Sequence, residues 1–302
     1  MEKIMVIVNP IAANGKVGRR WPSVKEFLES KGVPFSFALT QYPAHAISLA
    51  AEAVEKGFKT LIAFGGDGTL NEVVNGAFRH GISPEITLGA IPGGTGSDFT
   101  RSLGLPRDPI QAFAKILEGK TMRVDLGEIE CMKEGKEEKR YFINVAGMGF
   151  DAVVAERTNR SPKVFGGTIP YLYNLFLTLL TYRSLPFRIV LDSLRLELRA
   201  YLVVVANGKY FAGGMFIAPE ALLDDGKFYV AIGEDMSKLE FLSLVPKVYK
   251  GTHIHHRKVK IYEAQTVEIS SEATIFIQAE GEVVGTAPAV FRIHPQAVNF
   301  LY

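Results

Sequence analysis

The first 125 residues alternate short apolar, β-branched runs with segments whose apolar residues recur at helical spacing. Strands that alternate with helices form a mostly parallel sheet, and strands that are apolar throughout have both faces covered. We expect strands at residues 3–9, 34–39, 60–64 and 86–91, and helices at 18–30, 45–56, 70–78 and 109–118. Residues 1–125 are therefore predicted to form an α/β domain.

Residues 126–290 consist mainly of strand-like runs, at a spacing typical of an antiparallel β-sandwich. The runs cover residues 122–131, 140–145, 187–191, 194–207, 227–233, 258–262, 266–270 and 273–279. Two helices are expected among them, at 171–183 and 238–249. A final run, 291–302, is open to either domain, because spacing alone does not show whether it returns to the first.

The composition excludes several classes of function. Lysine and arginine total 34 against 32 acidic residues, so the net charge is +2 and no nucleic-acid partner is expected. The single cysteine, Cys131, excludes a disulfide within the chain and a cysteine-rich metal site. No apolar stretch reaches the ~20 residues of a transmembrane helix, and the first ten residues lack the features of a signal peptide. We therefore expect a cytoplasmic protein.

The strongest local signal is the glycine-rich stretch at residues 65–69, Gly-Gly-Asp-Gly-Thr, between a predicted strand and a predicted helix. Glycines let the backbone approach a phosphate group, and the N-terminus of the following helix favours negative charge. Asp67 fits such a loop if a Mg²⁺ ion intervenes, or if it polarises an incoming hydroxyl. The alternative is a glycine-rich turn in which Asp67 caps the helix.

Two further polar loops follow predicted strands, at residues 92–99 and 9–16. Strand ends of this kind lie at one edge of a parallel sheet, so the three loops are expected to converge on a ligand. Lys16 ends the loop at 9–16, and Arg19 and Arg20 come just after it. These three residues either meet phosphate or form a solvated helix face. The GxGxxA sequence at 147–152 lacks a βαβ context, and we interpret it as a tight turn before a helix.

Several stretches, in order along nearly the whole chain, resemble the diacylglycerol-kinase-like lipid kinases, which include bacterial diacylglycerol kinases and sphingosine kinases. These are residues 65–76 (GGDGTLNEVVNG), 92–106 (PGGTGSDFTRSLGLP), 144–152 (NVAGMGFDA), 207–226 and 280–282 (Glu-Gly-Glu). NAD kinases share the GGDGT core. The chain departs from the family pattern at Ser97, where asparagine is usual, and at Glu280, where the family has aspartate.

The resemblance implies an NAD-kinase-like α/β nucleotide-binding domain followed by an antiparallel β-sandwich domain, with the active site in the cleft between them. It implies transfer of the ATP γ-phosphate to a lipid hydroxyl, of a diacylglycerol-like acceptor, with Mg²⁺. The positions that match the family's nucleotide-binding residues are Asn9, Pro10, Lys16, Thr40, Gly65, Gly66, Asp67, Gly68, Thr69, Leu70, Asn71 and Thr95.

The resemblance also implies two catalytic carboxylates and a structural metal. Glu282 matches the general base, and Asp67 would hold the catalytic Mg²⁺ or aid that base. Asp225, with the carbonyls of Leu222 and Lys227, matches a structural Mg²⁺ site. Without the resemblance, Glu282 reads as an exposed hairpin glutamate and Asp225 as part of an Asp-Gly turn.

The residues alone do not identify the molecule that accepts the phosphate. The apolar stretch 165–183 is either a buried helix or a wall for acyl chains, with Arg183 and Arg188 near head groups at the inner face of a membrane. His253, His255 and His256 are expected in a solvated basic loop rather than a metal site. A kinase of a soluble acceptor such as NAD or a small polyol, and a non-catalytic nucleotide-binding regulator, are the alternatives. A homodimer is left open.

Overall fold

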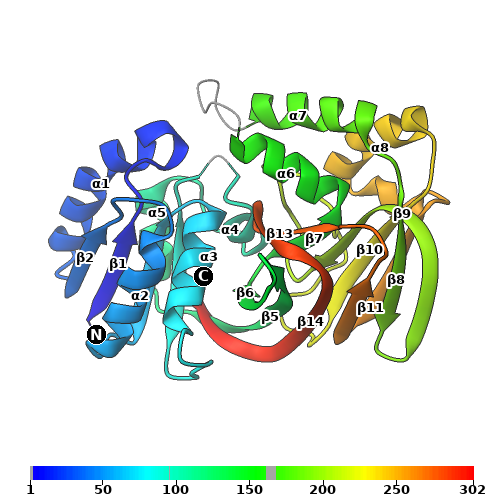
Figure 1. The fold of residues 1–302 in the computed structure, drawn as a ribbon. Helices are drawn as coiled ribbons and strands as arrows, with labels where there is room; N and C mark the ends of the chain where they lie inside the picture. Colours follow the sequence, from blue (N-terminus) through cyan, green and yellow to red (C-terminus); the bar gives the residue numbers. More distant parts are fainter. Residues whose placement is uncertain (1–2, 95, 161–167) are drawn as a thin grey trace. The chain divides into compact units, whose positions relative to one another are not determined.

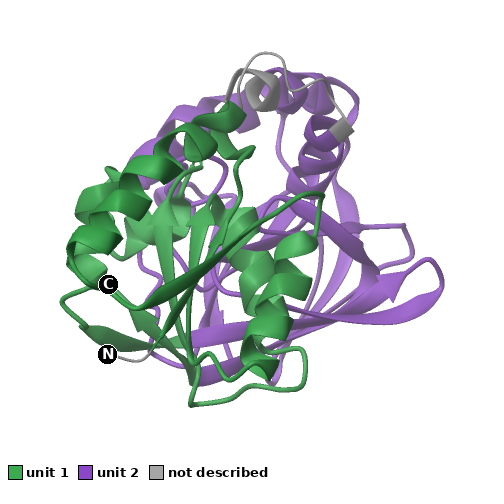
Figure 2. Ribbon diagram, turned by 90° about the vertical axis from the view of Figure 1, so that its left-hand side faces the viewer, with its two compact units in different colours: residues 1–124, 296–302 green, residues 125–295 purple. Residues whose placement is uncertain are grey.

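The computed structural model describes residues 3–94, 96–160 and 168–302, which form two compact units. The first unit comprises Met1–Val124 together with Gln296–Tyr302, and the second comprises Asp125–Pro295 (Figure 2). The chain therefore leaves the first unit once and returns to it with its last residues.

A parallel sheet forms the centre of the first unit, with strand order β4-β3-β1-β2. In register, Val6 of β1 lies opposite Phe37 of β2 and Ile62 of β3. The end of β14 adds a further parallel strand beside β4, where Phe300 pairs with Leu88. The four N-terminal strands are β1 (Ile4–Val8), β2 (Phe35–Leu39), β3 (Thr60–Gly65) and β4 (Thr87–Pro92).

Helices cover this sheet as the apolar strands predict. The crossover through α1 runs in the opposite direction along the sheet to those through α2 and α3, so right-handed connections place α1 on the other face from α2 and α3. Accordingly α2 packs on α3, and α1 packs on α5 (Figure 1). The helices are α1 (Ala12–Ser30), α2 (His45–Glu55), α3 (Asp67–Ala77), α4 (Asp98–Ser102) and α5 (Pro109–Ile116).

Two features of these helices differ from the expectation. The short helix α4 has no counterpart in the sequence pattern, because five residues are too few to show a helical period. Helix α1 starts earlier than expected, but it is interrupted at Ala13, Asn14 and Gly15, whose φ angles are 49°, 56° and 78°. These left-handed residues bend the chain between the end of β1 and the regular part of the helix.

The second unit is an antiparallel β-structure with an apolar core. Strands β11-β10-β9-β7-β13-β14 pair in that order, while β8 and β12 pair with each other and with β9 and β14. Alternate residues, such as Val203 and Val205 of β9 and Phe187 and Ile189 of β8, fill the core between them. The strands are β5 (Thr121–Lys133), β6 (Lys136–Phe142), β7 (Val145–Gly149), β8 (Leu185–Leu191), β9 (Leu194–Ala206), β10 (Phe228–Glu234), β11 (Val259–Ala264), β12 (Thr266–Ser270), β13 (Phe276–Ala279) and β14 (Glu282–Leu301).

Helices α6, α7 and α8 and the 3₁₀ helix η2 lie over the other face of the β7-β9-β10 sheet (Figure 1). Their bounds are α6 (Phe150–Arg160), α7 (Thr168–Thr181), α8 (Lys238–Lys250) and η2 (Thr252–His255). Gly147, which we interpreted as part of a turn, belongs to β7, and Gly149 makes the change to α6 with a φ of 95°. In the described part of the chain, no helix is both long enough and apolar enough to cross a membrane.

Candidate active site

Polar residues of the first unit gather at one edge of its sheet. Asn9, Thr40 and Gly66 directly follow β1, β2 and β3, and Gly93 follows β4. Backbone bonds tie the loops together: Asn9 N donates to Phe64 O (3.0 Å), Thr40 N to Val8 O (2.9 Å) and Gly93 N to Gly65 O (2.8 Å). Because the strands are parallel, their carboxyl ends share this edge, which is where open α/β sheets bind ligands.

The two glycine loops are in backbone contact with each other. A Cβ added to Gly94 would lie 2.5 Å from Gly66 Cα, and one added to Gly65 would lie 2.4 Å from Thr69 Oγ1. Ser97 accepts a hydrogen bond from Gly94 N at 3.2 Å, so it holds the second loop even though it replaces the usual asparagine. Only glycine fits these close approaches, which leave backbone rather than side chains at the ligand edge.

Asp67 is the first residue of α3, and its Oδ1 accepts the backbone N–H of Phe99 at 3.0 Å. Gly66, in an extended conformation, is the cap of this helix, so the alternative of Asp67 as the N-cap is wrong. Desolvation raises the pKa of Asp67, although the N–H of Phe99 opposes the shift. An unpaired buried carboxylate is costly, and a Mg²⁺ ion would offset that cost. The helix N-terminus beside Asp67 favours the phosphate groups that such an ion would accompany.

The other expected nucleotide-binding residues are distributed around this edge. Asn9 donates to Thr69 Oγ1 at 3.0 Å, and Asn9 Oδ1 is buried without a hydrogen-bond partner in the described residues, as is Asn71 Nδ2. The side chain of Leu70 is buried in the core, and Lys16 is exposed after the bend at 13–15. Pro10 and Gly68 are half-buried in their loops. Thr95 lies outside the described residues.

The proposed base of the second unit lies directly after a tight hairpin turn. Glu280 and Gly281, with φ angles of 53° and 82°, connect Ala279 of β13 to Glu282 of β14. Two positive φ angles at the central residues are typical of a type I′ turn. Glu282 is half-exposed, with a side-chain exposure of 46%, and pairs with Arg140 at 3.2 Å.

The departure at Glu280 has a structural role. Its Oε1 accepts backbone N–H groups from Ile143 (3.1 Å) and Asn144 (2.7 Å), and its own N–H donates to Val145 O at 3.0 Å. The longer side chain therefore ties the turn to the segment that enters β7.

The expected structural metal site is a loop whose carboxylate is already engaged. Asp225 Oδ1 accepts the N–H of Lys227 at 3.1 Å, and the side chain of Leu222 is exposed. Gly226 N donates to Asp125 Oδ2 at 2.7 Å, so a second carboxylate also holds this loop. Among residues 3–94, 96–160 and 168–302, no three histidine, cysteine or acidic side chains come together as a metal cluster would.

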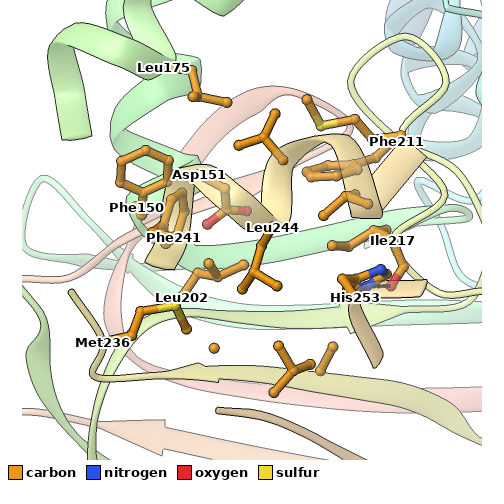
Figure 3. Close-up of a pocket in the computed structure, with 16 residues that line it drawn as sticks. Phe150, Asp151, Leu175, Leu202, Phe211, Ile217, Met236, Phe241, Leu244 and His253 are labelled. Carbon is orange, nitrogen blue, oxygen red and sulfur yellow. Dashed lines mark hydrogen bonds between the residues drawn. The ribbon is translucent and has the colours of Figure 1, made fainter. Parts of the chain in front are cut away.

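The second unit contains an apolar cavity of about 90 Å³ between its sheet and its helices (Figure 3). Its lining comes from the sheet face (Leu202, Ala231, Gly233, Val259), from α6 and α7 (Phe150, Asp151, Leu175), from α8 (Phe241, Leu244, Val245, Val248) and from Phe211, Met215, Ile217, Met236 and His253. The sequence did not indicate this role for α8, although four of its apolar residues recur at positions i, i+3, i+4 and i+7.

The apolar residues of α7 are divided between the interior and the surface. Leu175 and Leu179 are buried, whereas Tyr173, Phe176 and Leu180 are exposed by 62%, 47% and 54%. The side chains that precede Tyr173 in this helix lie outside the described residues. Buried and exposed apolar residues therefore alternate at helical spacing on two faces of one helix.

The expectation of a solvated loop is wrong for His253, which is 3% exposed and lines the cavity. Its Nε2 lies 3.0 Å from Ile217 O, and Nδ1 has no partner in the described residues. Burial lowers the pKa of His253, so the ring is neutral and Nε2 carries the proton. The basic residues that flank His253 in the sequence indicated an exposed loop. In the structure His253 belongs to η2, and its ring is buried.

Among the described residues, Asp151 is the one carboxylate that lines the cavity. Its Oδ2 accepts from Gln278 Nε2 at 3.0 Å, and its Oδ1 is buried without a partner in the described residues. Burial raises the pKa of Asp151 to about 6, although the bond from Gln278 opposes the shift. Asp151 lies in the stretch 144–152, which resembles a family motif, but the sequence indicated no function for its side chain.

Replacing Asp151 with asparagine is expected to stabilise the protein at neutral pH but not in acid. The rise in pKa from 3.8 to about 6 means that the folded state binds the proton more tightly than the unfolded state, so stability falls as the pH rises from about 4 to about 6. The shift corresponds to at most about 3 kcal/mol, and the buried amide of the variant offsets part of it. Urea unfolding of both proteins between pH 4 and 8 tests this, and a difference independent of pH would contradict it.

Comparison with known proteins identifies the family. Residues 3–129 match the diacylglycerol kinase catalytic domain, and residues 144–302 match the YegS C-terminal NAD kinase beta sandwich-like domain. A diacylglycerol kinase of Staphylococcus carnosus is 33% identical over 290 residues, covering 96% of this chain and 92% of that protein. The chain therefore belongs to the diacylglycerol kinase catalytic domain family and is a kinase of that family, which implies the use of ATP.

Solved structures show the same fold. A putative diacylglycerol kinase from Bacillus anthracis superposes with a TM-score of 0.82 at 24% identity, covering 100% of this chain and 95% of that one. Yeast NADH kinase complexed with NADH gives a TM-score of 0.54 at 11% identity, covering 99% and 82%. The predicted fold class, an NAD-kinase-like α/β domain followed by a β-rich domain, is confirmed.

Proposed function

We propose that this chain is an ATP- and Mg²⁺-dependent lipid kinase that transfers the γ-phosphate to the hydroxyl of a diacylglycerol-like acceptor. The first unit would bind ATP through its glycine loops, with Asp67 as a ligand of Mg²⁺, which neutralises phosphate charge when bound. The second unit would supply the acceptor cavity and Glu282, which takes the proton from the attacking hydroxyl.

The observation that carries the lipid acceptor is the apolar cavity of the second unit. Its wall is formed by aliphatic and aromatic side chains, with Asp151 and His253 as the polar exceptions. A short segment of an acyl chain matches such a lining at a volume of about 90 Å³, and burial of each CH₂ group contributes about 0.8 kcal/mol. A dinucleotide or a small polyol would leave its polar groups unpaired against these residues.

An exposed apolar surface nearby supports a substrate that is reached at a membrane. Tyr173, Phe176 and Leu180 project from α7, and Leu239, at the start of α8, is 80% exposed. Lys238 Nζ donates to Leu180 O, which joins the two helices at this surface. Large apolar side chains beside a lysine are typical of a peripheral, interfacial contact with lipid.

Transfer of radiolabelled γ-phosphate from ATP with Mg²⁺ tests the proposal. Diacylglycerol, long-chain bases, polyprenols and phosphatidylglycerol would be offered in mixed micelles, with NAD as the soluble acceptor. Label in a lipid that is lost in Asp67→Ala supports the lipid kinase. Label in NAD alone would identify a soluble acceptor, and ATP binding without transfer to any acceptor would favour a regulator.

Asp225, with the carbonyls of Leu222 and Lys227, would hold a structural Mg²⁺ ion. We expect Mg²⁺ to raise the melting temperature of the wild-type protein, and Asp225→Ala to lose that increase, because one ligand would be missing. Thermal melts with and without Mg²⁺ measure this, with Asp192→Ala as a control at another loop carboxylate that accepts backbone N–H groups. An equal increase in all three proteins would exclude the site.

A further inference from the structure

Gln278 connects the cavity to the turn before Glu282. The residue lies on β13 and is 3% exposed. Its side-chain amide nitrogen donates to Asp151 Oδ2 at 3.0 Å, and its amide oxygen accepts the N–H of Gly281 at 2.8 Å. One side chain therefore spans from the carboxylate of the cavity to the Glu280–Gly281 peptide, in the turn that leads to the proposed base.

The bridge uses both ends of the Gln278 amide. Asp151 offers an acceptor and Gly281 offers a donor, so the amide satisfies both groups when its nitrogen faces Asp151. Gly147 provides the space, because a Cβ at this position would lie 1.7 Å from Asp151 Oδ2 and 2.9 Å from Gln278 Nε2. The contact thus depends on a glycine of β7, which pairs with Gln278 in the sheet.

Other bonds also hold the turn close to the base. Asn159 donates to Gly281 O at 3.0 Å, and Glu280 is fixed to the segment before β7. Gln278 accepts the N–H of Gly281, so both the N–H and the C=O of Gly281 are bound by side chains of neighbouring elements. Glu282 follows immediately, and the direction of its side chain depends on how the Gly281–Glu282 peptide is oriented.

We propose that Gln278 is a positioning residue, which orients Glu282 by holding the N–H of Gly281 while Asp151 fixes the direction of its amide. This inference rests on the proposed function, in which Glu282 is the base. A side chain that acts only through another residue changes the rate of the chemical step and leaves nucleotide affinity unchanged.

The test compares Gln278→Leu and Gln278→Met with the wild type, because the longer methionine fills the space of glutamine if leucine impairs folding. Both are expected to lower kcat for γ-phosphate transfer to the lipid about tenfold and to leave the KM for ATP within about twofold. Gln265→Leu, an exposed glutamine before β12, is the matched control and is expected to behave as the wild type.

A double-mutant cycle separates positioning from a general structural effect. If Gln278 acts through Glu282, then Gln278→Met should cause no further loss in a Glu282→Gln background. An additional tenfold loss there, or full activity of folded Gln278→Met in the wild-type background, would overturn the inference alone. Full activity of Glu282→Gln would refute the proposed base and this inference together, and a wild type that phosphorylates no lipid would refute the proposed function itself.

Discussion

Glu282→Gln is expected to slow phosphoryl transfer to the lipid by about 10²–10⁴-fold, the usual contribution of a general base. The amide has nearly the size of the carboxylate and can still accept a hydrogen bond from Arg140, which lies 3.2 Å from Glu282 Oε2. It cannot take a proton from the attacking hydroxyl. The local structure should therefore be retained while the chemical step is lost.

The measurement is kcat with saturating ATP and lipid, together with ATP affinity, which should stay at the wild-type value. Glu272→Gln is the matched control, because Glu272 also pairs with an arginine, Arg188, at 2.7 Å on the same unit. This control should retain wild-type kcat. A Glu282→Gln enzyme within about twofold of the wild type would show that Glu282 is not the base.

Gly94→Ala is expected to weaken ATP binding at least about tenfold, because the new Cβ would lie 2.5 Å from Gly66 Cα. The added Cβ is attached directly to the backbone of one loop and meets the backbone of the other, so the two glycine loops must separate. Overpacking of this kind also costs about 1–3 kcal/mol of stability. The loss in nucleotide affinity should exceed what the change in stability explains, since the loops themselves form the ligand edge.

Gly89→Ala, five residues earlier in β4, is the control for this prediction. Its Cβ would meet Ile62 Cγ1 at 3.4 Å, which is an ordinary van der Waals contact. Equilibrium binding of ATP and urea unfolding should be measured for both variants. If Gly94→Ala binds ATP as tightly as Gly89→Ala, the glycine loops do not contact the nucleotide.

The fold class could be predicted because it depends on patterns that are local in sequence. Apolar runs such as residues 60–64 are buried on both faces, and they alternate with helical segments in the way that a parallel sheet requires. The short helix α4 was missed because five residues carry no periodicity. The glycine loops could be placed at one edge because parallel strands end on the same side.

The cavity and the bridge could not be predicted in this way. Asp151 and Gln278 are 127 residues apart, and no local pattern indicates that β7 and β13 are neighbours. His253 was assigned to solvent because charged residues surround it in sequence, yet the 3₁₀ helix turns its ring into the protein. Side-chain direction in such short, irregular segments is set by tertiary packing.

The return of β14 to the first unit determines the order in which that unit can be completed during synthesis. Phe300 packs on Phe99, with ring centroids 5.0 Å apart, and the strand covers the open side of β4. These residues leave the ribosome only after the whole of Asp125–Pro295. Until then β4 is a sheet edge with unpaired backbone groups, which is a site for wrong pairing. The nascent chain is therefore most exposed to aggregation while its second unit is being made.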